Sequence, residues 1–325
     1  MGHLQLGHVS LDGSKIHADA SKSKAVSYQR LLAIEAYLQA EVNELFALAQ
    51  AADGGQVPVE MNIGDEIERR EQQLARLAEA KKVLETRAQA RYEAEQADYE
   101  AKMKARAEKA AKSGRKPPGR PPQPPTPGPK DKDQYNFTDP ASRIMKNANN
   151  GGFDQHYNSQ IVVDHGSRLI VGNWLGDHPN DKQAALPTID TVPSALGKPA
   201  TVNLDTGYFS EDNIADLQAR EIEPYIATGR SPHHQGWRNY FLHNPDPLPK
   251  EATPKEQMAY KLRTEIGKAV YRLRKSTVEP VIGIIKEVLG FRQFSLRGLA
   301  AAGGEWTLVC LAYNLKRLHT LQSGS

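Results

Sequence analysis

Residues 113–130 contain eight prolines in eighteen positions, and this segment limits the possible folds more than any other in the chain. Proline fixes φ and lacks a backbone donor, so neither a helix nor a sheet can run through such a stretch. The segment therefore predicts an extended spacer that divides the chain into two ordered regions.

The region before the spacer is predicted to be helical. Residues 25–50 repeat apolar side chains at helical spacing, and residues 64–112 are dominated by Ala, Glu, Lys, Arg and Gln. Apolar positions become sparse after Leu84. This composition indicates a long, charged helix that is largely solvated, or one arm of a helical hairpin.

Strands and helices alternate on either side of this helical region. A first strand is predicted at residues 8–18, ending at the turn signal Asp12-Gly13. After the spacer come a β-hairpin over residues 157–175, a strand ending at Asp205, and further helices from residue 255 onward. The order predicts a mixed α/β sheet interrupted after its first strand.

Charge is distributed unevenly, although the net charge is only +3. Residues 255–317 carry twelve Lys and Arg against five Asp and Glu, a basic footprint typical of a surface that faces nucleic acid. The single cysteine, Cys310, lies in an apolar run and is expected to be buried. With no signal peptide and no apolar run long enough for a membrane span, we expect a cytoplasmic protein.

Three acids occupy distinctive places in this pattern. Asp12 and Asp205 end predicted strands, and Glu279 lies on a late helix among Arg274, Lys275 and other bases. Hard divalent cations prefer oxygen ligands. Carboxylates from three separate elements that meet at a sheet edge would form such a site, but spacing alone is weak support in a chain with 39 acids.

Several segments together resemble the bacterial insertion-sequence transposases that carry an Asp-Asp-Glu (DDE) active site. The segments that carry the resemblance are residues 11–16, 157–164, 180–182, 205–210, 274–280, 304–306 and 314–315. The resemblance covers nearly the whole chain and is strongest to insertion-sequence family 1182 within the family-4-like group.

The resemblance implies a ribonuclease-H-like α/β fold with a long, coiled-coil-like helical insertion after the first strand. It implies a catalytic domain formed by residues 1–24 and 156–325. The helical insertion would occupy residues 25–112, followed by the Pro-rich linker at 113–135 and a loop at 136–155 that leads into the second strand.

The resemblance also implies the chemistry. Asp12, Asp205 and Glu279 would be the catalytic residues and would hold two Mg²⁺ ions, with Mn²⁺ as a substitute. The protein would cleave double-stranded DNA at transposon ends and transfer the strand to target DNA. It would act as a homodimer in the synaptic complex, in the bacterial nucleoid.

Family 4 carries a Tyr-(2)-Arg-(3)-Glu-(6)-Lys signature, and this sequence follows it incompletely. Tyr271, Arg274, Glu279 and Lys286 keep the first and last gaps, but four residues separate Arg274 from Glu279. Lys275 stands where the arginine is expected. The predicted DNA contacts are one aromatic residue and three bases: Tyr271, Arg274, Lys275 and Lys286. Whether Arg274 or Lys275 makes the phosphate contact stays open.

Helical geometry gives a further expectation for this segment. At 100° per residue, Tyr271, Lys275, Glu279 and Lys286 fall within a sector of about 80°, and a second set of residues falls opposite. That set, expected to pack on the sheet, is Leu273, Thr277, Val281, Ile284 and Val288. Pro280 is expected to kink the helix unless a new helix starts near Thr277.

Other interpretations compete with an active transposase. The N-terminal region that precedes the first aspartate in this family is expected to be missing, which leaves a catalytically inactive remnant that only binds DNA or a partner as one alternative. A ribonuclease-H-like nuclease without strand transfer is another. Within the loop at 228–253, Trp237 and Tyr240 are candidates for base stacking, and His233 and His234 lack the cysteine partners typical of a zinc site.

Overall fold

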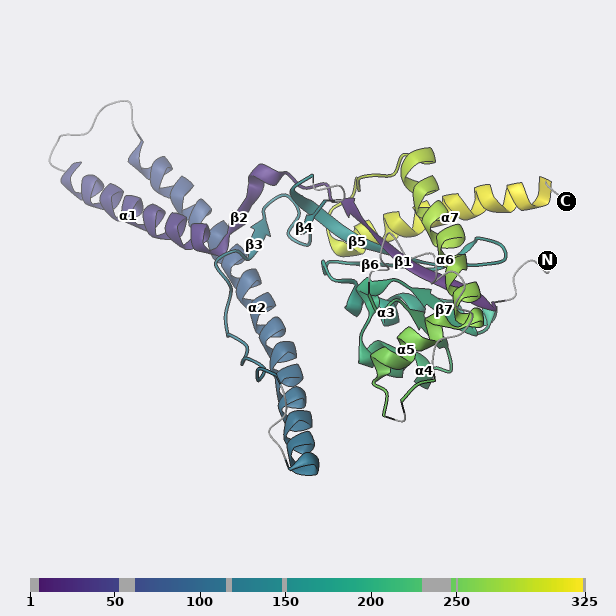
Figure 1. Ribbon diagram of the computed structural model, residues 1–325. Coiled ribbons are helices and arrows are strands. Elements are labelled where there is room, and N and C mark those ends of the chain that lie inside the picture. Colours follow the sequence, from purple (N-terminus) through teal and green to yellow (C-terminus); the bar gives the residue numbers. More distant parts are fainter. Residues whose placement is uncertain are drawn as a thin grey trace. The chain divides into compact units, whose positions relative to one another are not determined.

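In the computed structural model, residues 6–52, 62–114, 119–147, 151–229, 247–249 and 251–323 are described. The chain forms two compact units, one made of residues 1–22 and 138–325 and the other of residues 23–137 (Figure 1). In the described residues, no helix combines the length and apolarity needed to cross a membrane.

The smaller unit is a helical hairpin. Helix α1 (Tyr28–Ala52) packs on the 51-residue helix α2 (Ile63–Ser113), and strands β2 (Ala25–Ser27) and β3 (Gln134–Asn136) pair antiparallel at its base. Asn62 caps α2 by accepting from the backbone of Gly64 and Asp65. One buried apolar cluster in this unit contains Val26, Leu31, Leu38, Leu77, Ala80, Leu84 and Tyr135. The long charged helix is thus confirmed, and its buried apolar positions among the described residues extend to Ala88.

The described part of the Pro-rich segment has no helix or strand, as predicted, but it is bound to α2. Arg106 donates to the carbonyl of Gly119 at 2.7 Å, and Arg91 donates to the carbonyl of Gly128 at 3.1 Å and pairs with Asp133 at 2.9 Å. Carbonyls in a proline-rich chain have no ladder partner, so arginines of the neighbouring helix can satisfy them.

The larger unit is built on a mixed six-stranded sheet. Its strands run in the order β4-β5-β1-β7-β8, with β6 also paired to β5. Their bounds are β1 His8–His17, β4 Arg143–Lys146, β5 Phe153–Asp164, β6 Ile170–Gly176, β7 Thr201–Leu204 and β8 Glu223–Ile226. Strand β1 is antiparallel to β5 and parallel to β7.

Helices cover both faces of this sheet, because alternate strand residues point to opposite sides. One face packs Val9, Leu11 and Val202 against α3 (Ala185–Ile189), α4 (Glu211–Ala219) and α5 (Pro254–Arg263). The other packs against α6 (Glu265–Gly283), the π-helical segment η7 (Ile284–Val288) and α7 (Leu299–Ser323). The described residues also contain short 3-10 helices: η1 Lys22–Lys24, η3 Asp181–Gln183, η4 Ser194–Leu196 and η5 Thr206–Tyr208. Cys310 is buried on α7, as predicted.

Two expectations about the strands are wrong. Residues 136–155 are not simply a loop, since β4 pairs with β5 within them. The first strand does not end at Asp12-Gly13, because β1 continues to His17 and Gly13 pairs with Gln160 of β5. The antiparallel partner supplies a full ladder through these residues, which outweighs the local turn tendency of an Asp-Gly pair.

Candidate active site

Two of the predicted acids lie side by side because β1 and β7 are parallel neighbours. Ser10 pairs with Asn203, and Asp12 and Asp205 each follow two residues later in the same direction. Asp205 stands just past the end of β7, where its Oδ1 accepts from the backbone N–H of Gly207 at 2.7 Å. Asp12 lies inside β1, beyond the point where β7 stops.

Arg274, on helix α6, joins these acids to the third. One terminal nitrogen, Nη2, lies 2.6 Å from Asp12 Oδ2 and 3.8 Å from Asp205 Oδ2, and Nη1 lies 3.0 Å from Glu279 Oε1. The Arg274 side chain is only 11% exposed. Three carboxylates from three separate elements therefore share one guanidinium.

Burial makes the carboxyl group of Asp12 costly to ionise. It raises the pKa of Asp12 to about 6; the Arg274 charge lowers that pKa, while Asp205 and Asp181 raise it further. Asp12 is thus held as a carboxylate near neutral pH chiefly by the arginine beside it.

Asp181 is a fourth acid at this site that the sequence reasoning did not select. Its Oδ1 accepts from Asn158 Nδ2 at 2.7 Å and from Gln160 Nε2 at 3.2 Å. A Cβ added to Gly207 would lie 3.2 Å from its Oδ2. The available signal was its place within residues 180–182, a segment that carries the family resemblance, at the start of a helical turn after β6.

The polar network beneath Asp12 explains Gly13. A Cβ at this position would meet Gln160 Nε2 at 2.1 Å. Gln160 in turn donates to Asn158 and Asp181 and accepts from the hydroxyl of Tyr208. No side chain at position 13 can coexist with this arrangement.

Gly13→Ala is therefore expected to lower the free energy of unfolding by about 1–3 kcal/mol, as overpacking of a buried site does. Urea unfolding followed by circular dichroism measures it. Gly304→Ala on α7 is the control, because no atom lies within 4 Å of the added Cβ. That variant should be neutral or up to about 1 kcal/mol more stable. Equal effects of the two variants would contradict this account of Gly13.

A second buried cluster supports the start of β1. The hydroxyl of Ser10 and Nε2 of His165 lie 2.8 Å apart, and Asn203 Nδ2 donates to the carbonyl of Val270 on α6 at 2.8 Å. Burial, with a smaller contribution from the neighbouring His8, lowers the pKa of His165 to about 4, although Asp164 opposes the shift. His165 is consequently neutral in the folded protein at pH values where the unfolded chain binds a proton.

The lowered pKa of His165 makes the stability of the fold depend on pH. The lowered pKa contributes stability above pH 6.5, and that contribution is lost as the pH falls from 6.5 to about 4. We expect the wild type to lose up to about 3 kcal/mol more than His165→Gln over this range. Denaturant unfolding at a series of pH values tests it, with exposed His319→Gln as control. Parallel curves for wild type and His165→Gln would refute the assignment.

The predicted DNA contacts divide between two places. Arg274 lies among the carboxylates, with the half-buried Tyr271 one turn before it on α6; burial raises the pKa of Tyr271, and the Arg274 charge opposes the rise. Lys275 is exposed, and within the described residues it forms no ion pair. Lys286 lies apart, in η7.

The expected helical sector is wrong in part. Arg274, outside that sector, is the base that reaches Glu279, and Leu273 and Val288 of the expected buried side are exposed. The π-helical turn at η7 changes the angle per residue, so a 100° projection fails for Lys286. Helix α6 continues through Pro280, and no new helix starts at Thr277.

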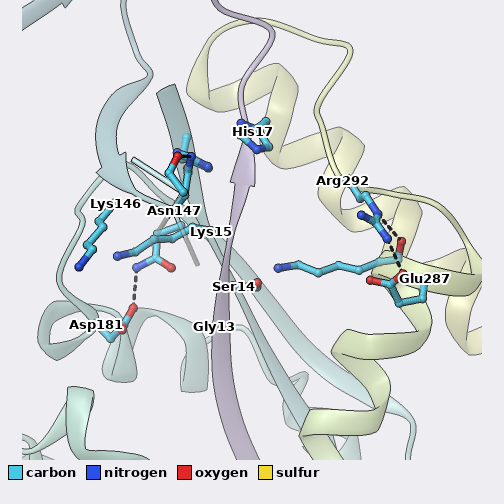
Figure 2. A pocket seen from close by; sticks show the side chains of 13 residues that line it. Gly13, Ser14, Lys15, His17, Lys146, Asn147, Asp181, Glu287 and Arg292 are labelled. Carbon is cyan, nitrogen blue, oxygen red and sulfur yellow. Dashed lines mark hydrogen bonds and ion pairs between the residues drawn. The ribbon is translucent and has the colours of Figure 1, made fainter. Parts of the chain in front are cut away.

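A pocket of about 760 Å³ opens beside Gly13, the residue that follows Asp12 in the chain (Figure 2). Residues 13–17 of β1 lie between its two walls, which come from the end of β4 on one side and from η7 and Arg292 on the other. The loop residues His233, His234, Trp237 and Tyr240 lie outside the described residues.

Comparison with known proteins identifies the family of the chain. The profile of the family described as "Transposase DDE domain" matches residues 125–315, more than half of the chain. The chain belongs to this DDE transposase family. Its mixed α/β sheet is consistent with a ribonuclease-H-like DDE domain.

A segment of the chain is similar to the protein named "Putative transposase for insertion sequence element IS402" from Burkholderia cepacia. The two are 34% identical over 87 residues, which is 25% of this chain and 41% of that relative. The match thus spans less than half of the relative's length.

Proposed function

We propose that this protein is a transposase that cleaves DNA at the ends of an insertion sequence and joins the freed 3′ end to target DNA. Asp12, Asp205 and Glu279 would hold divalent metal ions. The observation that carries the proposal is their convergence on a single cation, Arg274, from β1, the end of β7 and α6.

The donor chemistry of these residues fits Mg²⁺, with Mn²⁺ as a substitute, because all three offer carboxylate oxygens. Among the described residues no group of three or more His, Cys, Asp or Glu side chains is arranged to hold an ion directly, and the acids face Arg274 instead. We therefore propose that Arg274 gives up its carboxylate partners when metal is bound. Two ions in such a site would supply charge stabilisation to the attacking and leaving oxygens of phosphoryl transfer.

The surrounding side chains have roles of their own in this proposal. Once released, Arg274 would contact a phosphate of the DNA, together with Tyr271, Lys275 and Lys286. The first and last gaps of the signature, Tyr271 to Arg274 and Glu279 to Lys286, support a place in the family-4-like group near insertion-sequence family 1182. Double-stranded DNA at the element ends and at the target would be the substrate, and a second copy of the chain would complete the synaptic complex.

The decisive experiment is cleavage of supercoiled and element-end DNA by the intact chain, with and without Mg²⁺. Asp205→Asn serves as control, because the asparagine still accepts from Gly207 and preserves the turn after β7. Joining of a pre-cleaved 3′-OH end separates a transposase from a nuclease that only cuts. Absence of Mg²⁺-dependent cleavage by the wild type would reject the enzymatic function and favour a DNA-binding remnant.

A further inference from the structure

The pocket beside the acids follows the free edge of β1. Strand β7 pairs with β1 only as far as Ser10, and beyond this point β1 meets the described chain on that side through a bridge from His17 to Gln293. Lys15 and His17 from one face of β1, Ser14 from the other face, and residues of the flanking elements therefore line one open groove. The groove adjoins the acidic site, because Ser14 lies on the same face of β1 as Asp12, two residues further along the strand.

The charges in this groove are unbalanced. Glu287 forms an ion pair with Arg292, and Asp181 accepts hydrogen bonds from Asn158 and Gln160. Three lysines that line the groove have no ion-pair partner among the residues that the structure describes: Lys15, Lys146 and Lys286. Lysines without acidic partners that face a shared groove form a site for an extended polyanion.

The spacing along β1 relates this groove to the acids. Lys15 follows Asp12 by three residues, which is about 10 Å of strand at roughly 3.3 Å per residue, and the strand alternation places the two side chains on opposite faces of β1. One strand of duplex DNA carries a charge about every 3.4 Å of helix axis. A DNA strand that has its reacting phosphate at Asp12 and crosses the free edge of β1 would thus bring its neighbouring phosphates within reach of Lys15.

We propose that this groove binds the phosphates of one DNA strand adjacent to the reacting bond, with Lys15 and Lys146 on one wall and Lys286 on the other. The inference rests on the proposed function and extends it, because it assigns Lys15 and Lys146, which lie outside the signature on α6. These lysines are positioning residues: they hold the strand in register with the carboxylates without contacting the reacting atoms.

Charge reversal of the new pair tests the proposal. Lys15→Glu/Lys146→Glu is compared with Lys255→Glu/Lys316→Glu, two exposed lysines on α5 and α7 that change the net charge equally. Binding of a fluorescein-labelled duplex of mixed sequence is followed by anisotropy over a range of salt concentrations, without divalent metal. The groove variant is expected to bind at least about 30-fold more weakly at low salt, and its salt slope should fall by about 2, since each phosphate contact contributes about 0.9.

The control variant should keep its affinity within about threefold and its salt slope unchanged, as expected when no phosphate contact is lost. An equal loss in both variants would overturn the groove, since net charge alone would then explain it. Lys15→Gln/Lys146→Gln should show a smaller loss of DNA affinity. This variant shows whether the loss in the charge-reversed variant is due to misfolding. A single-stranded oligonucleotide should depend on the same two lysines, and undiminished single-strand binding by the groove variant would also overturn the inference.

Cleavage kinetics separate this inference from the proposed function. At saturating DNA the groove variant is expected to retain kcat while its KM rises in parallel with the dissociation constant. A wild type that cleaves DNA, with a groove variant of unchanged affinity and KM, would refute the groove and leave the transposase intact. A wild type whose DNA binding depends on Lys15 and Lys146 but which never cleaves DNA would support the groove and refute the proposed transposase function.

Discussion

Glu279→Gln is expected to lower the rate of Mg²⁺-dependent DNA cleavage on the order of 10³-fold while the protein stays folded. Glutamine keeps the size of the side chain but removes the charge that a metal ligand supplies, and a loss of about 4 kcal/mol of transition-state stabilisation corresponds to that factor. Glu279 is 47% exposed and forms an ion pair with Arg274. Its replacement should therefore leave the packing of α6 unchanged.

The matched control is Glu265→Gln, the same change in the exposed first turn of the same helix. It removes only a favourable helix-dipole contact, which costs less than about 1 kcal/mol, and cleavage should remain at the wild-type rate. Single-turnover cleavage with excess enzyme measures both variants, and DNA binding without metal shows that each still forms the complex. If Glu279→Gln cleaves as fast as Glu265→Gln, Glu279 is not a metal ligand.

Local pattern was enough to predict the strand that ends at Asp205. Residues 201–204 form a short buried strand, and Asp205 with Gly207 closes the turn after it. These features depend on neighbours in sequence, and the strand was placed correctly. Asp12 shows the opposite case, because its Asp-Gly turn signal is overridden by β5, almost 150 residues away in the chain.

The choice between Arg274 and Lys275 depended on information that the sequence does not contain. A uniform helical projection favours Lys275 beside Glu279, whereas the observed α6 brings Arg274 to the acids. Both bases lie within the uninterrupted helix α6, so the difference arises from tertiary packing, which turns Arg274 toward Asp12 of β1 and leaves Lys275 exposed. Asp181 was missed for a similar reason, since its relation to Asp12 exists only through the tertiary fold.

Arg274→Met should have the largest effect on stability, and the effect should depend on metal. The guanidinium is 11% exposed and balances Asp12, which is 15% exposed, together with two more accessible carboxylates. Removal of one partner from a mostly buried ion-pair group leaves unbalanced charge, and we expect the free energy of unfolding at pH 7 to fall by about 2–4 kcal/mol. Arg272→Met, an exposed neighbour on the same helix, should change it by less than about 0.5 kcal/mol.

Mg²⁺ should restore much of this loss if Arg274 and metal ions serve the same three carboxylates. A ligand at one hundred times its dissociation constant stabilises the folded state by about 2.7 kcal/mol, and the variant should reach this gain at lower Mg²⁺ than the wild type because no arginine competes. Urea unfolding with a series of Mg²⁺ concentrations measures both effects without any activity assay. A variant that Mg²⁺ does not stabilise would contradict a shared site.

The pH dependence of the stability of Arg274→Met tests independently whether Arg274 stabilises the fold through its charge. The pKa of Asp12 in the folded protein is about 6, above its ordinary value of 3.8, so the stability that its protonation provides is present at low pH and is lost as the pH rises through 3.8 to 6. Without Arg274 that pKa should rise further, because the arginine charge lowers it. The deficit of Arg274→Met should consequently shrink between pH 7 and pH 4, where a neutral Asp12 no longer needs a counter-charge. A deficit that grows on acidification would show that Arg274 stabilises the fold by packing and not as the cation of the acidic site.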